Sequence, residues 1–224
     1  MFTEDHPFYR FHFCPLCGSN RFVEHGPQAR HCEDCGFTYY TNPRGATVAV
    51  IVNDQGEILC GRRANNPAKG TRDMVGGFLD LDETAEEGMC REIKEETGLE
   101  VKPEDLHYLF SQPNRYPYSG IMCRTIDLFF EVRVKGRLRV GGLDDISSLE
   151  WIPLKNLNLE EFGLASIRKG LARYLEERGY YINFLNPREN ETFLLSSRAI
   201  ASVALLPRGA GQCACDLARH RHRP

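Results

Sequence analysis

One segment carries both a start signal and a stop signal for a helix, and it constrains the fold more than any other part of the chain. Thr84 and Glu87 stand three residues apart, the spacing of a capping box in which each side chain caps the other's backbone amide. Gly98 stands where helices commonly end in a left-handed residue. The sequence therefore predicts a helix over residues 84–97.

Three carboxylates share one face of this predicted helix. Glu92, Glu95 and Glu96 are spaced i, i+3 and i+4, and like charges at that spacing oppose each other by about 0.2–0.5 kcal/mol per pair. A divalent cation would turn this repulsion into binding, and hard oxygen ligands suit Mg2+ or Mn2+. Arg91 and Lys94 are placed to orient or partly neutralise the cluster. The alternative for an isolated pattern of this kind is a solvated acidic helix face.

The cysteines indicate a second metal site. The chain has nine, an odd number that makes a poor disulfide framework and favours a reducing compartment, the cytoplasm. Four form two Cys-x2-Cys pairs, Cys14 with Cys17 and Cys32 with Cys35. Two such turns complete a tetrahedron of thiolates, the closed geometry of structural Zn2+, with free thiols as the alternative. His31 is expected at the surface rather than among the ligands.

Hydrophobic patterning predicts a mixed α/β chain. A β-branched run ends in a turn signal, and a second long apolar run lies in the downstream half. The expected elements are a strand at 46–54, its hairpin partner at 56–61, a loop at 64–73, strands at 122–135 and 149–153, and a helix at 159–178 with apolar residues at helical spacing.

Charge and hydropathy exclude some classes of protein. A net charge of −3 argues against binding DNA by bulk charge, and no apolar run reaches the roughly 18 residues of a membrane helix. Residues 192–224 differ, with five Arg, no Lys and one acidic residue. We expect a largely disordered extension there; the alternatives are a nucleic-acid-binding arm or a metal site at Cys213, His220 and His222.

The acidic helix lies within a longer motif. Gly77, Glu83 and the run Arg91-Glu92-Ile93-Lys94-Glu95-Glu96-Thr97-Gly98-Leu99 match the Nudix box at every fixed position. The sequence therefore resembles the Nudix hydrolases, which hydrolyse a nucleoside diphosphate linked to another group. The resemblance implies an α/β/α sandwich around a mixed sheet, preceded here by a small zinc ribbon.

Two features resemble one branch of that family, the NADH pyrophosphatases. One is a zinc ribbon directly before the Nudix domain. The other is the segment Ser111-Gln112-Pro113-Asn114-Arg115-Tyr116-Pro117-Tyr118-Ser119, which matches the SQPWPFPxS signature of the branch at Ser111, Gln112, Pro113, Pro117 and Ser119. Asn114 and Arg115 replace Trp-Pro, and Tyr116 replaces Phe.

The resemblance implies roles for particular residues. Glu92, Glu95 and Glu96 would hold Mg2+ or Mn2+ and supply the catalytic base, with the Gly76 carbonyl as a further ligand and Glu83 and Arg91 in support. An extra carboxylate would be Asp145, with Asp144 as the alternative, because it lies six residues before the single tryptophan. Phe78 and Tyr40 would stack on the base, and Ser111, Gln112 and Ser119 would contact substrate.

The predicted domains are a lead-in (1–12), the zinc ribbon (13–41), the Nudix domain (42–178) and a C-terminal extension (179–224). The favoured function is hydrolysis of NAD(H) to NMN(H) and AMP. The alternatives are ADP-ribose or another nucleoside diphosphate derivative, removal of NAD caps from RNA, or a non-catalytic nucleotide sensor or zinc-ribbon nucleic-acid-binding protein. A small dinucleotide is the expected partner, NAD-capped RNA is the alternative, no membrane is expected, and the resemblance allows a homodimer.

Overall fold

The computed structural model describes residues 2–137 and 146–180. Its first sheet is small and antiparallel, in the order β1-β2-β3, with β1 at Phe22–Glu24, β2 at Ala29–Cys32 and β3 at Thr38–Tyr40. The buried cluster beneath it consists of Cys14, Phe22 and Cys32, with Phe37 packed against it. So small a core provides little hydrophobic stabilisation, which is the usual reason for a metal in a unit of this size.

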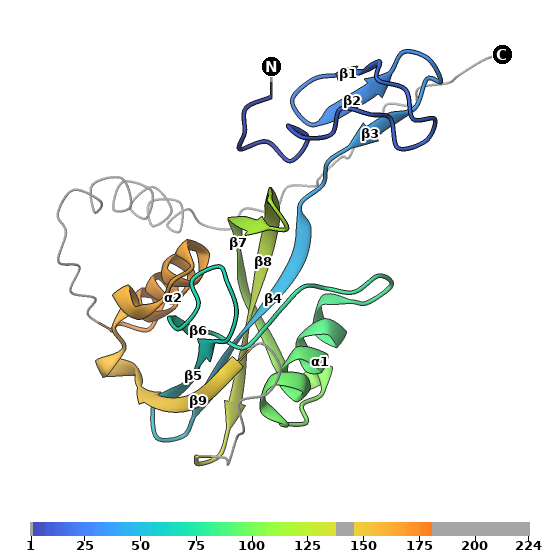
Figure 1. Ribbon diagram of the computed structural model, residues 1–224. Helices are drawn as coiled ribbons and strands as arrows, with labels where there is room; N and C mark the ends of the chain where they lie inside the picture. Colours follow the sequence, from blue (N-terminus) through green and yellow to red (C-terminus); the bar gives the residue numbers. More distant parts are fainter. Residues whose placement is uncertain (1, 138–145, 181–224) are drawn as a thin grey trace, which may run out of the picture. The chain divides into compact units, whose positions relative to one another are not determined.

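The second sheet contains the six remaining strands, β4 to β9 (Figure 1). Its strand order is β6-β5-β4-β8-β7, and β9 pairs with β5. The central strands β4 and β8 run parallel over ten residue pairs, from Arg44↔Thr125 to Asn53↔Val134, and the other pairings are antiparallel. The strand bounds are β4 Arg44–Asn53, β5 Glu57–Arg63, β6 Arg72–Asp73, β7 Leu106–Tyr118, β8 Ile121–Val134 and β9 Ile146–Pro153.

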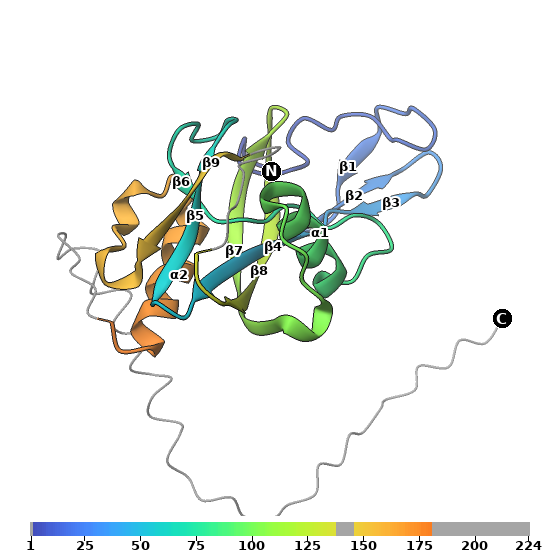
Figure 2. The ribbon, with the colours of Figure 1, turned by 90° about the horizontal axis from the view of Figure 1, so that it is seen from below.

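Two helices cover opposite faces of this sheet (Figure 2). Helix α1 spans Ala85–Thr97 and packs Met89 and Ile93 against one face. Helix α2 spans Ala165–Glu177 and packs Ile167 and Leu171 against the other. The predicted α/β/α sandwich with a mixed sheet is confirmed. Short 3-10 turns lie at Pro103–Asp105 (η1), Leu154–Asn156 (η2) and Leu159–Glu161 (η3).

The elements differ from the sequence predictions in four places. The predicted loop at 64–73 ends in the short strand β6. The expected helix over 159–178 begins with the η3 turn, and its α-helix starts only at Ala165. The expected hairpin partner pairs with β4 only at Val52↔Ile58, because the rest of β5 pairs with β9 and β6. The longest difference is β7, thirteen residues that were not predicted as a strand.

Some predictions fall outside the described residues. Asp145 and its alternative Asp144 are among them, as is the predicted C-terminal extension from residue 181 onward. Of the helices that the structure describes, none has the length and apolar character needed to cross a membrane.

Candidate active site

Helix α1 begins and ends as its sequence signals predict. The Thr84 hydroxyl accepts a hydrogen bond from the Glu87 amide at 3.2 Å, and the Glu87 carboxylate accepts one from the Thr84 amide at 2.8 Å. At the other end Gly98 has φ 74°, and its amide donates to the Lys94 carbonyl. The helix is thus fixed at both ends, which fixes the positions of the glutamates it carries.

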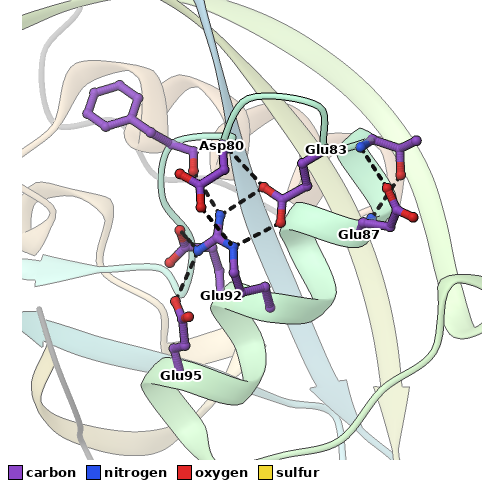
Figure 3. A network of polar contacts seen from close by, with 8 residues as sticks. Asp80, Glu83, Glu87, Glu92 and Glu95 are labelled. Atoms are coloured by element: carbon purple, nitrogen blue, oxygen red, sulfur yellow. Dashed lines mark hydrogen bonds and ion pairs between the residues drawn. The ribbon is translucent and has the colours of Figure 1, made fainter.

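The guanidinium of Arg91 gathers the carboxylates of this region (Figure 3). It donates to both oxygens of Glu83, at 2.9 and 3.0 Å, a bidentate pair that lowers the pKa of Glu83. The same side chain donates to Glu92 at 2.8 Å, to Glu95 at 3.0 Å and to the Phe78 carbonyl at 3.0 Å. One arginine therefore connects the loop before α1 to two of the predicted metal-binding glutamates.

The glycines before α1 allow the chain to approach these carboxylates closely. Gly76 has φ 146°, and a Cβ there would meet the Thr47 carbonyl oxygen at 2.0 Å. A Cβ on Gly77 would meet a carboxylate oxygen of Glu92 at 2.4 Å. The Gly76 amide donates to Glu96 at 2.9 Å. Side chains at these two positions would therefore displace the loop or the glutamates.

A cavity of about 350 Å3 lies beside this loop, within the size range of small-molecule sites. One wall combines the box glutamates with the glycine loop; it consists of Gly76, Gly77, Phe78, Asp80, Arg91, Glu92, Glu95 and Glu96. Glu96 is buried, and the side chain of Glu95 is 46% exposed. Both a buried anchor and an accessible carboxylate are therefore present on this wall.

The donor set on this wall fits a hard divalent cation such as Mg2+ or Mn2+, since it offers carboxylate and carbonyl oxygens. The glutamates are not drawn together as the cysteines are. Among the described residues, only the four cysteines form a set of three or more ligand side chains with all ligand atoms within 4.8 Å. Glu92 and Glu95 each pair with Arg91, and Glu96 accepts a hydrogen bond from the Gly76 amide.

Aromatic rings surround Phe78 at the edge of the cavity. The guanidinium carbon of Arg44 lies 4.2 Å from the centre of the Phe78 ring. The rings of Tyr116 and Tyr118 meet Phe78 edge-on, with centroids at 5.7 and 6.2 Å. Phe78 and Tyr116 both line the cavity, and stacking of Phe78 on a base stays a prediction.

The cavity lining also contains residues that the sequence did not single out as site residues. Arg63 pairs with the buried Asp73 and donates to the Tyr116 hydroxyl at 3.1 Å. Asn114, Thr125 and Asp127 join them from the paired strands β7 and β8; they line the cavity with the apolar Met74, Leu164 and Ile167. Asn114 and Tyr116 had a signal in the sequence, since they are where the NADH pyrophosphatase signature is broken. Asp127 had none beyond being an acidic residue inside an apolar run.

Other predicted substrate residues do not line this cavity. Tyr40 lies in β3 and is 57% exposed. Ser111 and Gln112 lie within β7, and Ser119 has φ 49° in the turn after it. These three belong to one long hairpin with β8 rather than to a loop, and Gln112 shares its strand face with Asn114.

The four cysteines converge. Cys14 Sγ lies 3.7 Å from Cys35 Sγ, and Cys17 Sγ lies 3.6 Å from Cys32 Sγ. Zn–S bonds of about 2.3 Å in a tetrahedron give S···S edges of about 3.8 Å, so the spacing fits zinc. The two turns are alike, since Gly18 and Gly36 each donate to the carbonyl four residues back, at 2.9 Å. His31 is not part of this group, and its Nδ1 forms a hydrogen bond with the Thr38 hydroxyl at 2.8 Å.

Comparisons with known proteins agree with this geometry. The NUDIX domain model matches residues 42–175. An ADP-ribose pyrophosphatase of Methanocaldococcus jannaschii is 36% identical over 138 residues, covering 62% of this chain and 78% of that protein. The NAD-capped RNA hydrolase NudC of Vibrio atlanticus is 32% identical over 145 residues, covering 65% of this chain and 50% of that protein. The chain thus spans about half the length of the NAD-capped RNA hydrolases it matches.

Solved structures share the fold. A NUDIX hydrolase from Nitrosomonas europaea superposes with a TM-score of 0.54 at 21% identity, over 74% of this chain and 91% of that one. The chain belongs to the Nudix family. Within the family it is similar to the NAD-capped RNA hydrolases, in agreement with the predicted resemblance to the NADH pyrophosphatase branch.

Proposed function

We propose that this protein is a metal-dependent pyrophosphohydrolase that splits the phosphoanhydride of a nucleoside diphosphate linked to another group, with NAD(H) as the first candidate substrate. The observation that carries the proposal is the shared cavity. The box glutamates line part of this cavity, and polar residues of the β7–β8 hairpin together with Met74, Leu164 and Ile167 line another part that suits a base. A dinucleotide needs both.

The chain's own residues have distinct tasks in this reaction. Glu92, Glu95, Glu96 and the Gly76 carbonyl would hold the divalent cation, which supplies charge neutralisation at the phosphates and a lowered pKa of water. Arg91 keeps Glu92 and Glu95 in position through its hydrogen bonds. One of the three carboxylates accepts the proton of the attacking water; Glu95 is the most exposed of them and therefore the most accessible.

ADP-ribose is the second candidate substrate. This chain covers 78% of the length of the M. jannaschii ADP-ribose pyrophosphatase, against 50% of the V. atlanticus NudC. The partial signature around Asn114 also departs from the NADH branch. NAD-capped RNA remains the third candidate, because the NudC proteins carry that activity in their name.

The test is a panel of NADH, NAD+, ADP-ribose and NAD-capped RNA with Mg2+ or Mn2+, with products identified by mass spectrometry. NADH should give NMNH and AMP. Turnover of ADP-ribose far above that of NADH would replace the first candidate with the second. Absence of turnover on the whole panel, with nucleotide binding retained, would favour the non-catalytic sensor. The homodimer and the cytoplasmic location stay predictions, to be checked by light scattering and fractionation.

A further inference from the structure

Part of the cavity lining consists of paired residues of the β7–β8 hairpin. Asn114 is paired directly with Thr125, and Gln112 with Asp127. Side chains in a strand alternate between faces, so Asn114, Thr125 and Asp127 lie on the same face of the sheet. All three line the cavity. The strand register therefore brings a carboxylate, an amide and a hydroxyl together at one place.

Asp127 is the unusual member of this group, because it is a buried acid without the kind of partner that buried acids normally have. It is 4% exposed. The Thr125 hydroxyl donates to it at 2.6 Å, and the side chains of Ser166 and Asn114 also interact with it. All three partners are neutral. The neighbouring buried acid Asp73, in contrast, pairs with Arg63. Burying a carboxylate without a cation is costly, and at a cavity wall such a group is a candidate for binding a ligand.

A second observation points to a ligand at this cavity. The Thr47 hydroxyl, which also belongs to a residue of the cavity lining, is buried and has no hydrogen-bond partner within the described parts of the chain. Thr47 pairs with Leu128, so it lies on the face of the sheet opposite to Asp127 and is a separate polar group of the cavity. The apolar residues Met74, Leu164 and Ile167 line the same cavity as Asn114, Thr125 and Asp127. Polar atoms that converge between apolar side chains are the usual make-up of a site for a flat heterocycle.

We propose that Asp127 and Asn114 select the substrate's base by reading an edge that carries an amino group beside a hydrogen-bond acceptor. This proposal rests on the proposed function and specifies how that site chooses its substrate. A carboxylate accepts hydrogen bonds, and an amide both donates and accepts. Adenine offers such an edge with its amino group and N1, and nicotinamide offers one with its carboxamide. Replacement of the amino group by oxygen places an acceptor against Asp127.

The experiment compares substrates that differ only at this edge. The pairs are ADP-ribose with its hypoxanthine analogue, and NAD+ with nicotinic acid adenine dinucleotide. The wild-type protein should prefer the amino member of one pair by at least about tenfold in kcat/KM, since a site built to hydrogen-bond a group rejects analogues that lack it. Asp127→Asn should reduce that preference about tenfold or more. The pair that responds identifies whether adenine or nicotinamide lies against Asp127.

A matched control is Glu131→Gln, which alters another buried acid of β8 that lies outside this cavity; it should leave the preference unchanged. Asn114→Ala provides a second route if Asp127→Asn does not fold. Equal loss on both members of each pair would overturn the proposal, as would a shift in the metal concentration needed for activity.

A binding measurement separates this proposal from the proposed function. Dissociation constants of AMP, IMP, NMN and nicotinic acid mononucleotide are measured by calorimetry on the wild-type chain and on Asp127→Asn. If no substrate is hydrolysed but the Asp127-dependent preference for one amino member persists in binding, the proposed function fails and the selection site stands. If hydrolysis is found without any preference that depends on Asp127, the selection site fails and the proposed function stands.

Discussion

At the residue scale, Arg91 holds the carboxylates of the Nudix box in position. Its guanidinium donates to three carboxylates and one carbonyl. The hydrogen bonds to Glu83 are the largest cause of the raised pKa of Arg91. A lysine could not make the same set of contacts, because the planar fork is what serves Glu83 bidentately while reaching Glu92 and Glu95. The geometry of the glutamates therefore depends on this side chain as well as on the helix.

Replacing Glu95 by Gln should lower kcat by about 100-fold or more, because a neutral amide neither binds a divalent cation well nor accepts a proton. The side chain is 46% exposed, so stability should change little. Steady-state kinetics and thermal unfolding check both statements. Glu104→Gln, at an exposed position in η1, is the matched control and should behave as the wild type. Unchanged activity of Glu95→Gln would contradict the metal assignment.

Replacing Gly77 by Ala should raise the Mg2+ concentration for half-maximal activity about tenfold, since the new methyl group displaces the Glu92 carboxylate that it would meet at 2.4 Å. The carboxylate is the end of a flexible side chain, so the melting temperature should fall only slightly. Gly170→Ala is the converse control. Its Cβ would meet the ring of Phe129 at 2.2 Å, which should cost about 1–3 kcal/mol of stability and leave the metal requirement unchanged. Identical metal titrations for both variants would refute the prediction.

Residues with a local signal could be predicted from the sequence, and residues without one could not. The capping box at Thr84 and the left-handed Gly98 follow from chemistry within a few residues, and both are confirmed. Asp127 and Asn114 are thirteen residues apart, and only the pairing of β7 with β8 brings them to one wall. Because register is a tertiary property, no local pattern could reveal this part of the site.

At the element scale, Glu131 links β8 to α2. Burial raises the pKa of this carboxyl. Hydrogen bonds from Arg133 and Tyr174 and the charge of Arg178 lower the pKa by a larger amount, so the net shift is downward. The Tyr174 hydroxyl donates at 2.8 Å, and Arg178 forms an ion pair with the same carboxylate. The helix is therefore attached to the sheet by polar contacts as well as by its apolar face.

The depressed pKa of Glu131 predicts how stability depends on pH. A folded-state pKa below the ordinary value of 4.5 means that the contribution is fully present above that value and is lost as pH falls below it. Glu131→Gln should therefore be less stable than the wild type at pH 7, and the difference should narrow below pH 4.5. Urea unfolding at pH 7, 5 and 3.5 measures it. A difference that does not depend on pH would show that packing, not charge, is lost.

Elements with a strong apolar run or caps were predicted well, as β4, β8 and α1 show. Strand β7 was missed because Pro113 and Pro117 interrupt its pattern, and proline normally argues against a strand. Proline is tolerated here because β7 lies at the end of the sheet order and, among the described strands, pairs with β8 alone. The sequence could not show which strand would lie at the edge.

At the scale of the whole described chain, two metal sites of opposite chemistry are expected. Four thiolates select zinc, and carboxylates select magnesium or manganese. Burial raises the pKa of Cys32, but the amides of Cys35 and Asp34 and the neighbouring thiols lower it to about 6, as expected where backbone amides turn toward sulfur.

Removal of the two metals should have separable effects. Brief treatment with EDTA should abolish hydrolysis, and added Mg2+ should restore it, with one zinc per chain still found by elemental analysis. A thiol-directed mercurial should release that zinc and make residues 13–41 sensitive to protease before the rest of the chain, because their hydrophobic core is small. Retention of protease resistance after zinc release would argue against a structural metal.

Two of the segments that line the cavity are separate in the chain, namely the α1 helix with its preceding loop and the β7–β8 hairpin. If the proposed function and the proposed base selection both hold, bond cleavage and choice of nucleotide depend on different segments of the chain. A library randomised only at the hairpin residues that line the cavity should change which substrates are hydrolysed while the metal-binding glutamates stay intact. Evolution could retune such an enzyme for new metabolites in the same way, one cross-strand pair at a time.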